Sequence, residues 1–366
     1  MSKIKVLFVG MSDNLGGIEI FGRDLILNSD LNEIDYTLLL KEGVSLPFQD
    51  DLVSKGVKIL RFHSRKTNYL KFLKDLKAVF QNNKFDIVHI NIMDYSFFEV
   101  IKYAHKNNCK IILHSHNGGY IDGRWKNKVL NKIGKTIVKK YEVERVACSE
   151  DAGKYLFDGM PFKVFLNGID FEKFEFSQKN RNEIREELNI DKKTYLIGNI
   201  GAFWAPKNHV FLVRVFAKVK AKNNNVKLLL VGDGEELGKI KSLVTDMRLE
   251  DDVIFLQKRI DIERIYSALD LYVAPSISEG MSLALCEAQV NNLKCIVSNG
   301  VGKTSDISGT VKFLDLSSSE KWVEVILDNT VDMKREKVYI DSKFDVKNTV
   351  HEICEYYAER SIADGC

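Results

Sequence analysis

Short apolar runs alternate with longer helical patterns along this chain, and the alternation occurs in two successive series. Strand and helix alternating at this spacing predict a parallel sheet whose two faces are covered by helices. Two series therefore predict an α/β fold with two doubly wound, Rossmann-like domains facing a cleft, where ligands bind at the carboxyl ends of the strands. The predicted strands are residues 4–9, 36–40, 57–62, 86–91, 110–114 and 145–148, then 195–200, 226–231, 253–256, 271–274, 295–298 and 311–314.

The division between the domains is expected near the turn signal at residues 167–170. A chain of 366 residues also exceeds what one hydrophobic core usually supports. We assign residues 1–170 to the first domain and residues 171–345 to the second, in which a short charged helix within 177–193 comes before the second sheet. The last segment, 346–366, has a helical pattern and is expected to pack back on the first domain.

Composition excludes several classes of protein. The formal net charge of +3 is too small to indicate nucleic-acid binding. Six cysteines without paired short spacing argue against a zinc ribbon or a disulfide framework and indicate reduced thiols. No apolar stretch approaches the ~20 residues that a spanning helix needs, and the first apolar run is a strand rather than a secretory signal. We expect a cytoplasmic protein that can touch a membrane without crossing it.

Two glutamates follow the apolar run at 271–274, Glu279 in a loop and Glu287 in the helical pattern after it. Gly280 permits a tight loop, from which a helix can start at Leu283. Free amide groups at such a helix start can bind an anion, and carboxylates accept hydrogen bonds from hydroxyl groups. The pair therefore indicates a ligand that carries both phosphate and hydroxyl groups. The alternative is two solvated glutamates, one of them a good helix former.

Glycines and histidines mark the predicted ligand edge of the first domain. Gly16 and Gly17 stand where a helix begins, and glycine there lets the backbone approach a phosphate, although a tight turn explains them equally well. His114 and His116 follow a strand, and alternation puts both side chains on one face. Their roles could be a sugar or phosphate contact, a metal ligand or a structural one. His89 is interpreted as a satisfied histidine at a strand end.

Three further candidates follow strands of the second domain. Lys207 lies between the first strand and its helix, where a cation would neutralise a diphosphate leaving group; the alternative is a solvated loop lysine. Gly232 begins a second close-approach loop, and Arg259 follows the third strand. No Asp-x-Asp occurs, nor a phosphate-binding Gly-x-x-x-x-Gly-Lys-Ser/Thr loop or a Gly-x-Ser-x-Gly elbow, which weakens the kinase and hydrolase hypotheses.

Together these residues resemble the family 4 retaining glycosyltransferases of the GT-B architecture, especially the bacterial capsular and exopolysaccharide transferases. The most specific part of the resemblance is the Glu-seven-Glu motif that contains Glu279 and Glu287; the glycine loops are individually weak. The remaining motifs are residues 16–19, 114–117, 167–170, 207–208 and 231–234.

The resemblance implies a role for each candidate. The first domain would bind the acceptor and the second a nucleotide sugar, with Glu287 on the ribose, Lys207 on the diphosphate and Arg259 at the base. His114 would lie beside the transferred sugar, with His116 and Asn117 as polar contacts. His114 and Glu279 are the predicted catalytic residues. The donor would further be contacted by Gly16, Gly17, Gly232, Gly280, Met281, Ser282 and Leu283.

This chain departs from the family pattern at Ala202, where the family usually has an arginine. Losing one charged hydrogen-bonding partner costs about 1.5 to 3 kcal/mol. Arg259 could compensate, activity could be weak, or a partner subunit could be required. The motif also has Met281 and Ser282 where leucine and proline are more usual.

The resulting hypothesis is a metal-independent retaining hexosyltransferase without a cofactor. It would move a hexose or N-acetylhexosamine from a nucleotide diphosphate sugar, expected to be uridine-linked, to a lipid-linked or growing saccharide in cell-surface polysaccharide biosynthesis. Two alternatives stay open: a sugar-nucleotide epimerase of the same architecture, and a non-catalytic nucleotide-sugar-binding subunit.

A basic amphipathic pattern at residues 125–146 suggests contact with the inner face of the cell membrane. Its apolar residues fall at helical spacing and lysines flank them. The alternative is an ordinary surface helix that packs its apolar stripe inward.

Overall fold

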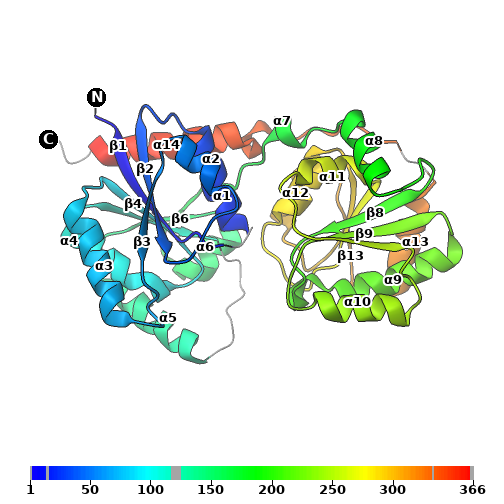
Figure 1. Cartoon of the computed structure of the whole chain (residues 1–366), viewed down its shortest axis with the longest axis horizontal. Helices are drawn as coiled ribbons and strands as arrows, with labels where there is room; N and C mark the ends of the chain where they lie inside the picture. Colours follow the sequence, from blue (N-terminus) through cyan, green and yellow to red (C-terminus); the bar gives the residue numbers. More distant parts are fainter. Residues whose placement is uncertain (1, 14–15, 117–124, 332–333, 363–366) are drawn as a thin grey trace. The chain divides into compact units, whose positions relative to one another are not determined.

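The computed structural model describes residues 2–13, 16–116, 125–331 and 334–362 (Figure 1). The chain divides into two compact units. Unit 1 is Met1–Gly168 together with Lys343–Cys366, and unit 2 is Ile169–Ser342. The expected boundary between residues 170 and 171 lies close to this division. That the two domains face each other across a cleft stays a prediction.

Unit 1 contains a parallel sheet with the strand order β3-β2-β1-β4-β5-β6-β7. Its strands are β1 (Ile4–Val9), β2 (Ile34–Lys41), β3 (Lys58–Phe62), β4 (Ile87–Ile92), β5 (Lys110–Ser115), β6 (Glu144–Ala147) and β7 (Lys163–Val164). Its helices are α1 (Gly17–Asn28), α2 (Gln49–Ser54), α3 (Tyr69–Asn82), η1 (Tyr95–Phe97), α4 (Phe98–Lys106), α5 (Trp125–Val138), α6 (Glu150–Phe157), η4 (Ser342–Phe344), which begins at the unit boundary, and α14 (Val346–Ile362).

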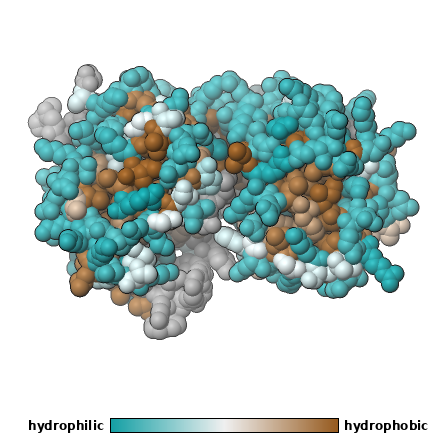
Figure 2. All heavy atoms as spheres, viewed as in Figure 1, coloured by the Kyte–Doolittle hydropathy of each residue, from teal (hydrophilic) through white to brown (hydrophobic). Residues whose placement is uncertain are grey.

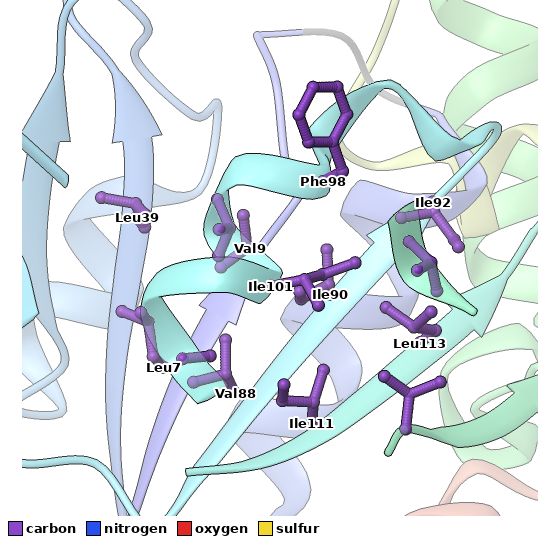
Figure 3. Packing of buried hydrophobic residues seen from close by; sticks show 14 of the residues in the cluster. Leu7, Val9, Leu39, Val88, Ile90, Ile92, Phe98, Ile101, Ile111 and Leu113 are labelled. Atoms are coloured by element: carbon purple, nitrogen blue, oxygen red, sulfur yellow. The ribbon is translucent and has the colours of Figure 1, made fainter. Parts of the chain in front are cut away.

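The strands of unit 1 bury side chains on both faces. Leu7 and Val9 lie in one hydrophobic cluster (Figure 3), whereas Val6 and Phe8 lie in the other. Successive side chains of a strand point to opposite faces, so a strand covered on both sides is apolar throughout. Helix α14 contributes Tyr357 and neighbouring residues to the second cluster.

Unit 2 contains a second parallel sheet with the order β10-β9-β8-β11-β12-β13. Its strands are β8 (Tyr195–Ile200), β9 (Val226–Val231), β10 (Val253–Leu256), β11 (Leu271–Ala274), β12 (Lys294–Ser298) and β13 (Lys312–Leu314). Its helices are α7 (Phe171–Phe174), α8 (Gln178–Glu187), η2 (Ala205–Lys207), α9 (His209–Lys222), α10 (Leu237–Asp246), α11 (Ile262–Ala268), α12 (Leu283–Val290), η3 (Lys303–Ser305) and α13 (Ser319–Asn329). Two doubly wound parallel-sheet domains confirm the predicted fold class.

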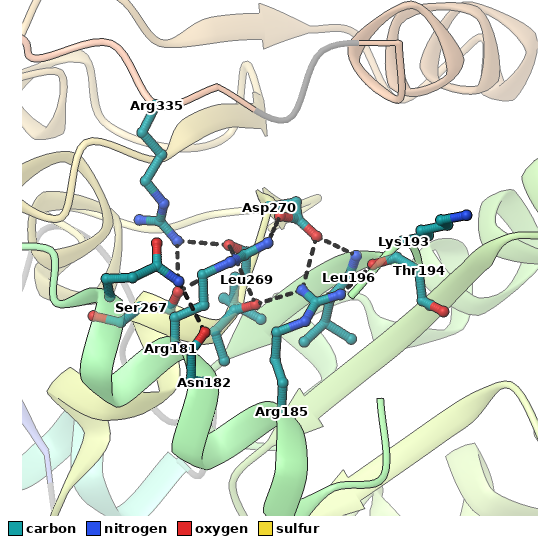
Figure 4. Close-up of polar contacts among 12 residues, drawn as sticks. Arg181, Asn182, Arg185, Lys193, Thr194, Leu196, Ser267, Leu269, Asp270 and Arg335 are labelled. Atoms are coloured by element: carbon teal, nitrogen blue, oxygen red, sulfur yellow. Dashed lines mark hydrogen bonds and ion pairs between the residues drawn. The ribbon is translucent and has the colours of Figure 1, made fainter. Parts of the chain in front are cut away.

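A buried charge cluster holds the amino end of β11 (Figure 4). The Asp270 carboxylate accepts hydrogen bonds from Arg181 at 2.5 Å, from Arg185 at 3.1 Å and from the Leu196 N–H at 2.7 Å. Arg335 donates to backbone oxygens at the end of α11, among them Leu269 O at 2.6 Å. The cluster joins α8 to β8 and β11, and it therefore fixes the strand from which the Glu279 loop departs.

On the face that Figure 2 shows, hydrophobic residues gather near the middle of each unit and hydrophilic residues surround them. Five of the cysteines, Cys109, Cys148, Cys286, Cys295 and Cys354, are free thiols, as expected; Cys366 lies outside the described residues. Within the described part of the chain, no helix has both the length and the apolar character needed to cross a bilayer.

The structure corrects two predictions about the first domain and adds one strand to it. Residues 125–146 do not form one helix, because α5 ends at Val138 and the chain turns there to enter β6. Val138 and Val143 are both buried, which forces this turn. The two-residue strand β7 was not predicted, and His89 lies inside β4 rather than at a strand end.

Candidate functional site

The loop between β11 and α12 is held in place by the loops on both sides of it. The Ile277 N–H donates to Pro206 O at 2.7 Å, which ties the loop to η2. On the other side the Glu279 N–H donates to Gly300 O at 2.9 Å, and Glu279 O accepts from the Gly302 N–H at 2.9 Å. Because three loops at the carboxyl edge of one sheet brace each other, the Glu279 side chain has a defined position.

Glu279 forms an ion pair with Lys207 and accepts a hydrogen bond from the Ser276 hydroxyl at 2.8 Å. Burial alone raises the pKa of the Glu279 carboxyl, but the Lys207 ammonium and the hydrogen bonds to the carboxylate lower it, and the net pKa lies below its usual value. Glu279 is therefore ionised at neutral pH. Ser276 was not among the predicted site residues, since nothing in its sequence context distinguishes it from a loop serine.

Lys207 is not a solvated loop lysine. Its side chain is 26% exposed and its partner Glu279 is 14% exposed, so the pair is largely shielded from water. The lysine carbons pass close to Gly201, where a Cβ would lie 3.6 Å from Lys207 Cε. Ala202 follows in the same loop with only a methyl group, so Lys207 is the one Lys or Arg among residues 201–208.

The start of α12 has the properties of an anion site. The first amide groups of a helix, here those of Leu283, Ala284 and Leu285, have no partner inside the helix. The N-cap residue Ser282 does not cap them with its side chain. The buried Ser282 hydroxyl instead lies against the Glu279 carboxylate and helps to lower the pKa of that carboxyl. The helix dipole adds partial positive charge at this position.

Glu287 is oriented by a buried tyrosine. The Tyr266 hydroxyl donates to Glu287 Oε2 at 2.7 Å and also lies 3.0 Å from Ala284 O. Burial, followed by the nearby Glu287 carboxylate, raises the pKa of Tyr266 well above its usual value, so the phenol keeps its proton. Glu279 and Glu287 thus both belong to the segment that follows β11. Tyr266 was not among the predicted site residues, because it lies inside an apolar helical pattern.

Gly232 and Arg259 have structural partners within unit 2. Gly232 has φ +147°, and a Cβ on it would lie 2.0 Å from Gly201 O, so glycine allows the β9 loop to approach the β8 loop. Arg259 pairs with Asp261 and Glu187. Hydrogen bonds to these carboxylates raise the pKa of Arg259. Compensation for Ala202 by Arg259 would require these ion pairs to open.

In unit 1, Gly16 and Gly17 begin α1 as predicted. The buried Glu19 carboxylate accepts hydrogen bonds from the Gly16 N–H at 3.1 Å and from the Ser12 N–H at 2.9 Å. A Cβ on Gly16 would lie 2.9 Å from Glu19 Oε2, so glycine makes room for this carboxylate. Glu19 therefore holds the loop that leads into α1.

The structure brings His114 and His116 together on one face of the sheet, with ring centroids 4.1 Å apart. His89 Nε2 lies 3.1 Å from His114 Nδ1, and the His89 Nδ1 lies 2.5 Å from the Tyr357 hydroxyl. Burial lowers the pKa of His89 and of His116 to about 3 and that of His114 well below its usual value. All three rings are therefore neutral near pH 7. Asn117 lies outside the described residues.

Helix α5 packs against η1 through the Gly134 side, where a Cβ would lie 2.0 Å from Tyr95 O. Val129 and Ile133 are exposed at 48% and 46%, whereas Ile137 packs partly against the core. The apolar face of α5 therefore packs only partly against the core of unit 1. The exposed lysines next to it are Lys132, Lys139 and Lys140. Within the described residues no group of three His, Cys, Asp or Glu side chains is arranged to hold a metal ion.

Two family models match the chain. The model described as Glycosyltransferase Family 4 matches residues 15–173. The model described as Glycosyl transferases group 1 matches residues 180–323, which include Lys207, Glu279 and Glu287. The first match lies almost wholly in unit 1, and the second lies within unit 2.

Similar proteins include EpsF of Bacillus subtilis (strain 168), named as a glycosyltransferase, with 28% identity over 89% of this chain and 87% of that protein. An Escherichia coli UDP-Gal:alpha-D-GlcNAc-diphosphoundecaprenol alpha-1,3-galactosyltransferase is 27% identical over 81% of this chain and 80% of its own length. Anabaena HepE in complex with UDP and glucose superposes with a TM-score of 0.80, covering 97% of this chain and 99% of HepE. At 17% identity that last likeness concerns the fold.

Proposed function

Because this chain belongs to the family 4 glycosyltransferases of the GT-B architecture, resembling the capsular and exopolysaccharide enzymes, we propose that it transfers a hexose or N-acetylhexosamine from a UDP-sugar, with retention of configuration. Its place is in polysaccharide biosynthesis. The acceptor is a lipid-linked or growing saccharide. This proposal draws on the E. coli relative, whose name specifies a UDP-galactose donor and a diphosphoundecaprenol-linked acceptor.

One arrangement carries the proposal: the Lys207–Glu279 ion pair lies in the loops that precede the start of α12. The site offers the Lys207 ammonium and the first amide groups of α12, which have no acceptor inside the helix. A diphosphate needs cationic and hydrogen-bond donors, and a sugar needs carboxylate acceptors such as Glu279. Glu287, held by Tyr266, is the proposed contact for the ribose hydroxyls.

The proposed reaction places negative charge where these donors lie. The bond between the sugar C1 and the diphosphate oxygen breaks, and its electron pair leaves with the diphosphate. The acceptor hydroxyl oxygen bonds to C1 on the same face, and its proton passes to the departing diphosphate oxygen. Preorganised donors aimed at developing charge contribute most to catalysis of this kind. Lys207 and the amides of α12 therefore stabilise the leaving group without a metal ion.

The first domain is proposed to bind the acceptor and to supply His114, His116 and Asn117 as polar sugar contacts. His114 is neutral, so it acts as a hydrogen-bonding group rather than as a cation. Gly16, Gly17, Gly232, Arg259 and the backbone of 280–283 complete the proposed donor and acceptor contacts.

The exposed part of α5 is proposed to contact the inner surface of the cell membrane, where a lipid-linked acceptor would be found. Val129 and Ile133 supply apolar area, and the neighbouring lysines match the charge of anionic lipid. Flotation with phosphatidylglycerol vesicles tests this. The Val129→Ser/Ile133→Ser variant should lose binding, and Val53→Ser, a change at an equally exposed valine on α2, should retain it. Wild-type protein that fails to float at low salt would contradict the membrane contact.

A transfer assay tests the proposed function. The wild-type chain is incubated with UDP-glucose, UDP-galactose or their N-acetylhexosamine counterparts and a lipid-linked saccharide, in the presence of EDTA. We expect UDP release and a lengthened saccharide whose new linkage keeps the donor configuration. Modified donor without acceptor would indicate an epimerase instead. Normal UDP-sugar binding with transfer only after a second chain is added would indicate a binding subunit that needs a partner.

A further inference from the structure

A chain of buried hydrogen bonds connects the C-terminal helix to the two histidines. The Tyr357 hydroxyl of α14 lies 2.5 Å from His89 Nδ1, and His89 Nε2 of β4 lies 3.1 Å from His114 Nδ1 of β5. All three side chains are 1% exposed or less. The opposite nitrogen of His114, Nε2, is buried and has no hydrogen-bond partner among the described residues. The positions of the protons along these hydrogen bonds decide whether His114 Nε2 donates a hydrogen bond to a ligand or accepts one from it.

Each of these hydrogen bonds has one donor and one acceptor that can be assigned. The Tyr357 phenol keeps its proton because burial raises its pKa, and among the described residues His89 is its one hydrogen-bond partner. Tyr357 therefore donates to His89 Nδ1. A neutral imidazole has one N–H, so the His89 proton is on Nε2 and is donated to His114 Nδ1. The His114 proton is then on Nε2, which makes that nitrogen a hydrogen-bond donor.

Asn91 fixes the tautomer of His116, but here the nitrogen left without a partner among the described residues is the acceptor. The Asn91 amide nitrogen donates to Val9 O at 2.9 Å, which turns its oxygen toward His116 Nε2 at 2.8 Å. His116 Nε2 therefore carries the proton and donates to this oxygen. The remaining nitrogen, His116 Nδ1, is an acceptor that has no partner within the described part of the chain.

We propose that Tyr357, acting through His89, is a positioning residue that fixes His114 as an Nε2–H donor, while Asn91 fixes His116 as an Nδ1 acceptor, and that this pair recognises a hydroxyl group. A hydroxyl both accepts and donates a hydrogen bond, whereas a fully ionised phosphate only accepts and an ammonium only donates. The ring centroids are 4.1 Å apart, so the donor and the acceptor belong to adjacent rings. That the hydroxyl belongs to a sugar rests on the proposed function; the proton positions do not.

Nitrogen NMR of the histidine side chains tests the proton positions without any substrate. The wild-type chain is labelled with ¹⁵N-histidine, and long-range ¹H–¹⁵N spectra are recorded near pH 7. The seven histidines are assigned with single His→Gln variants. We expect protonated Nε2 and bare Nδ1 for His89, His114 and His116. A His114 ring protonated on Nδ1, or on both nitrogens, would overturn the proposal.

Two tyrosine variants of α14 form a matched pair. Tyr357→Phe removes the hydroxyl that donates to His89, and we expect the Nδ1-protonated form of His114 to become populated. Tyr356→Phe removes the neighbouring hydroxyl, which instead donates to Glu144 at 2.8 Å, and we expect wild-type histidine spectra. Unchanged histidine signals in Tyr357→Phe would refute the relay. The wild-type spectrum decides the matter even if Tyr357→Phe does not fold.

Activity provides a second, separate measurement. In the transfer assay, Tyr357→Phe should lower kcat by about 2- to 10-fold, the size of one neutral hydrogen bond, with little change in the KM for the UDP-sugar. Tyr356→Phe should keep the wild-type kcat. If no UDP-sugar is used, the proposed function fails while the spectra still test the relay. If transfer occurs but the spectra show the other tautomer, only the relay fails.

Discussion

Replacing Lys207 with methionine tests the proposed diphosphate contact. Methionine keeps much of the length and apolar character of the lysine stem but removes the ammonium that pairs with Glu279. The variant therefore changes the charge of the site by one unit and leaves the loop contacts of Pro206 and Ile277 intact. UDP is the best ligand for this test, because it has the diphosphate but lacks the transferred sugar that Glu279 is proposed to contact.

The expected loss follows from one charge-assisted hydrogen bond. Such a bond contributes about 1.5 to 3 kcal/mol, which corresponds to a Kd for UDP that is about 10- to 150-fold weaker. Lys207→Met also leaves the Glu279 carboxylate without its cation near an anionic ligand. The double variant Lys207→Met/Glu279→Gln removes that repulsion, and its Kd should lie between those of Lys207→Met and wild type. Glu279→Gln alone should bind UDP at least as tightly as wild type.

Isothermal titration of each variant with UDP at low and high salt measures these differences. The matched control is Lys218→Met, which removes an exposed lysine paired with Glu320 on the same unit and should leave the Kd unchanged. The wild-type affinity should fall with salt more steeply than that of Lys207→Met. Equal UDP affinities for wild type and Lys207→Met would refute the assignment of Lys207 to the diphosphate.

Three further predictions concern the framework of the site. Asp270→Asn leaves Arg181 and Arg185 without their buried counter-charge and should lower the free energy of unfolding in urea by about 3 to 5 kcal/mol. Glu320→Gln at an exposed pair should leave the free energy of unfolding almost unchanged, and equal losses would contradict the buried cluster. The pKa of Glu279 is lowered in the fold, so the stability that its ionised carboxylate contributes is present above the ordinary pKa of 4.5 and is lost as the pH falls below that value. In urea titrations, the free energy of unfolding should therefore fall more steeply with acid for wild type than for Glu279→Gln. Parallel curves would contradict the ion pair. Gly232→Ala should destabilise unit 2 by at least about 1 to 3 kcal/mol, because Gly232 has a positive φ and lies close to the Gly201 oxygen. The control Gly238→Ala, in open space within α10, should not destabilise it. Similar melting temperatures for the two variants would contradict the close approach.

Sequence patterns predicted most of the fold because several strands end just before a glycine or proline that begins a loop. The runs at 195–200, 226–231 and 271–274 end at Gly201, Gly232 and Pro275, and the structure has β8, β9 and β11 with these bounds. The two-residue strand β7 is too short to show a pattern. The end of α5 depends on Val138 and Val143 both reaching the core, which local periodicity does not reveal.

In the candidate site too, local sequence patterns could be predicted and long-range contacts could not. Glu279 and Glu287 stand out because a loop glycine and a helix pattern lie beside them in the sequence. Their partners could not be predicted, since Lys207 is 72 positions from Glu279 and pairs with it only when β8 and β11 lie side by side. Tyr357 is 268 positions from His89 and lies in a helix whose packing is tertiary. Long-range hydrogen bonds of this kind leave no local signal.

A crystal structure of the chain with UDP would test the central claim most directly. The account predicts the diphosphate within hydrogen-bonding distance of Lys207 Nζ and of the amide groups at Leu283 and Ala284, with the ribose hydroxyls on Glu287. UDP bound with its diphosphate away from the start of α12, or with Lys207 still paired only to Glu279, would contradict it.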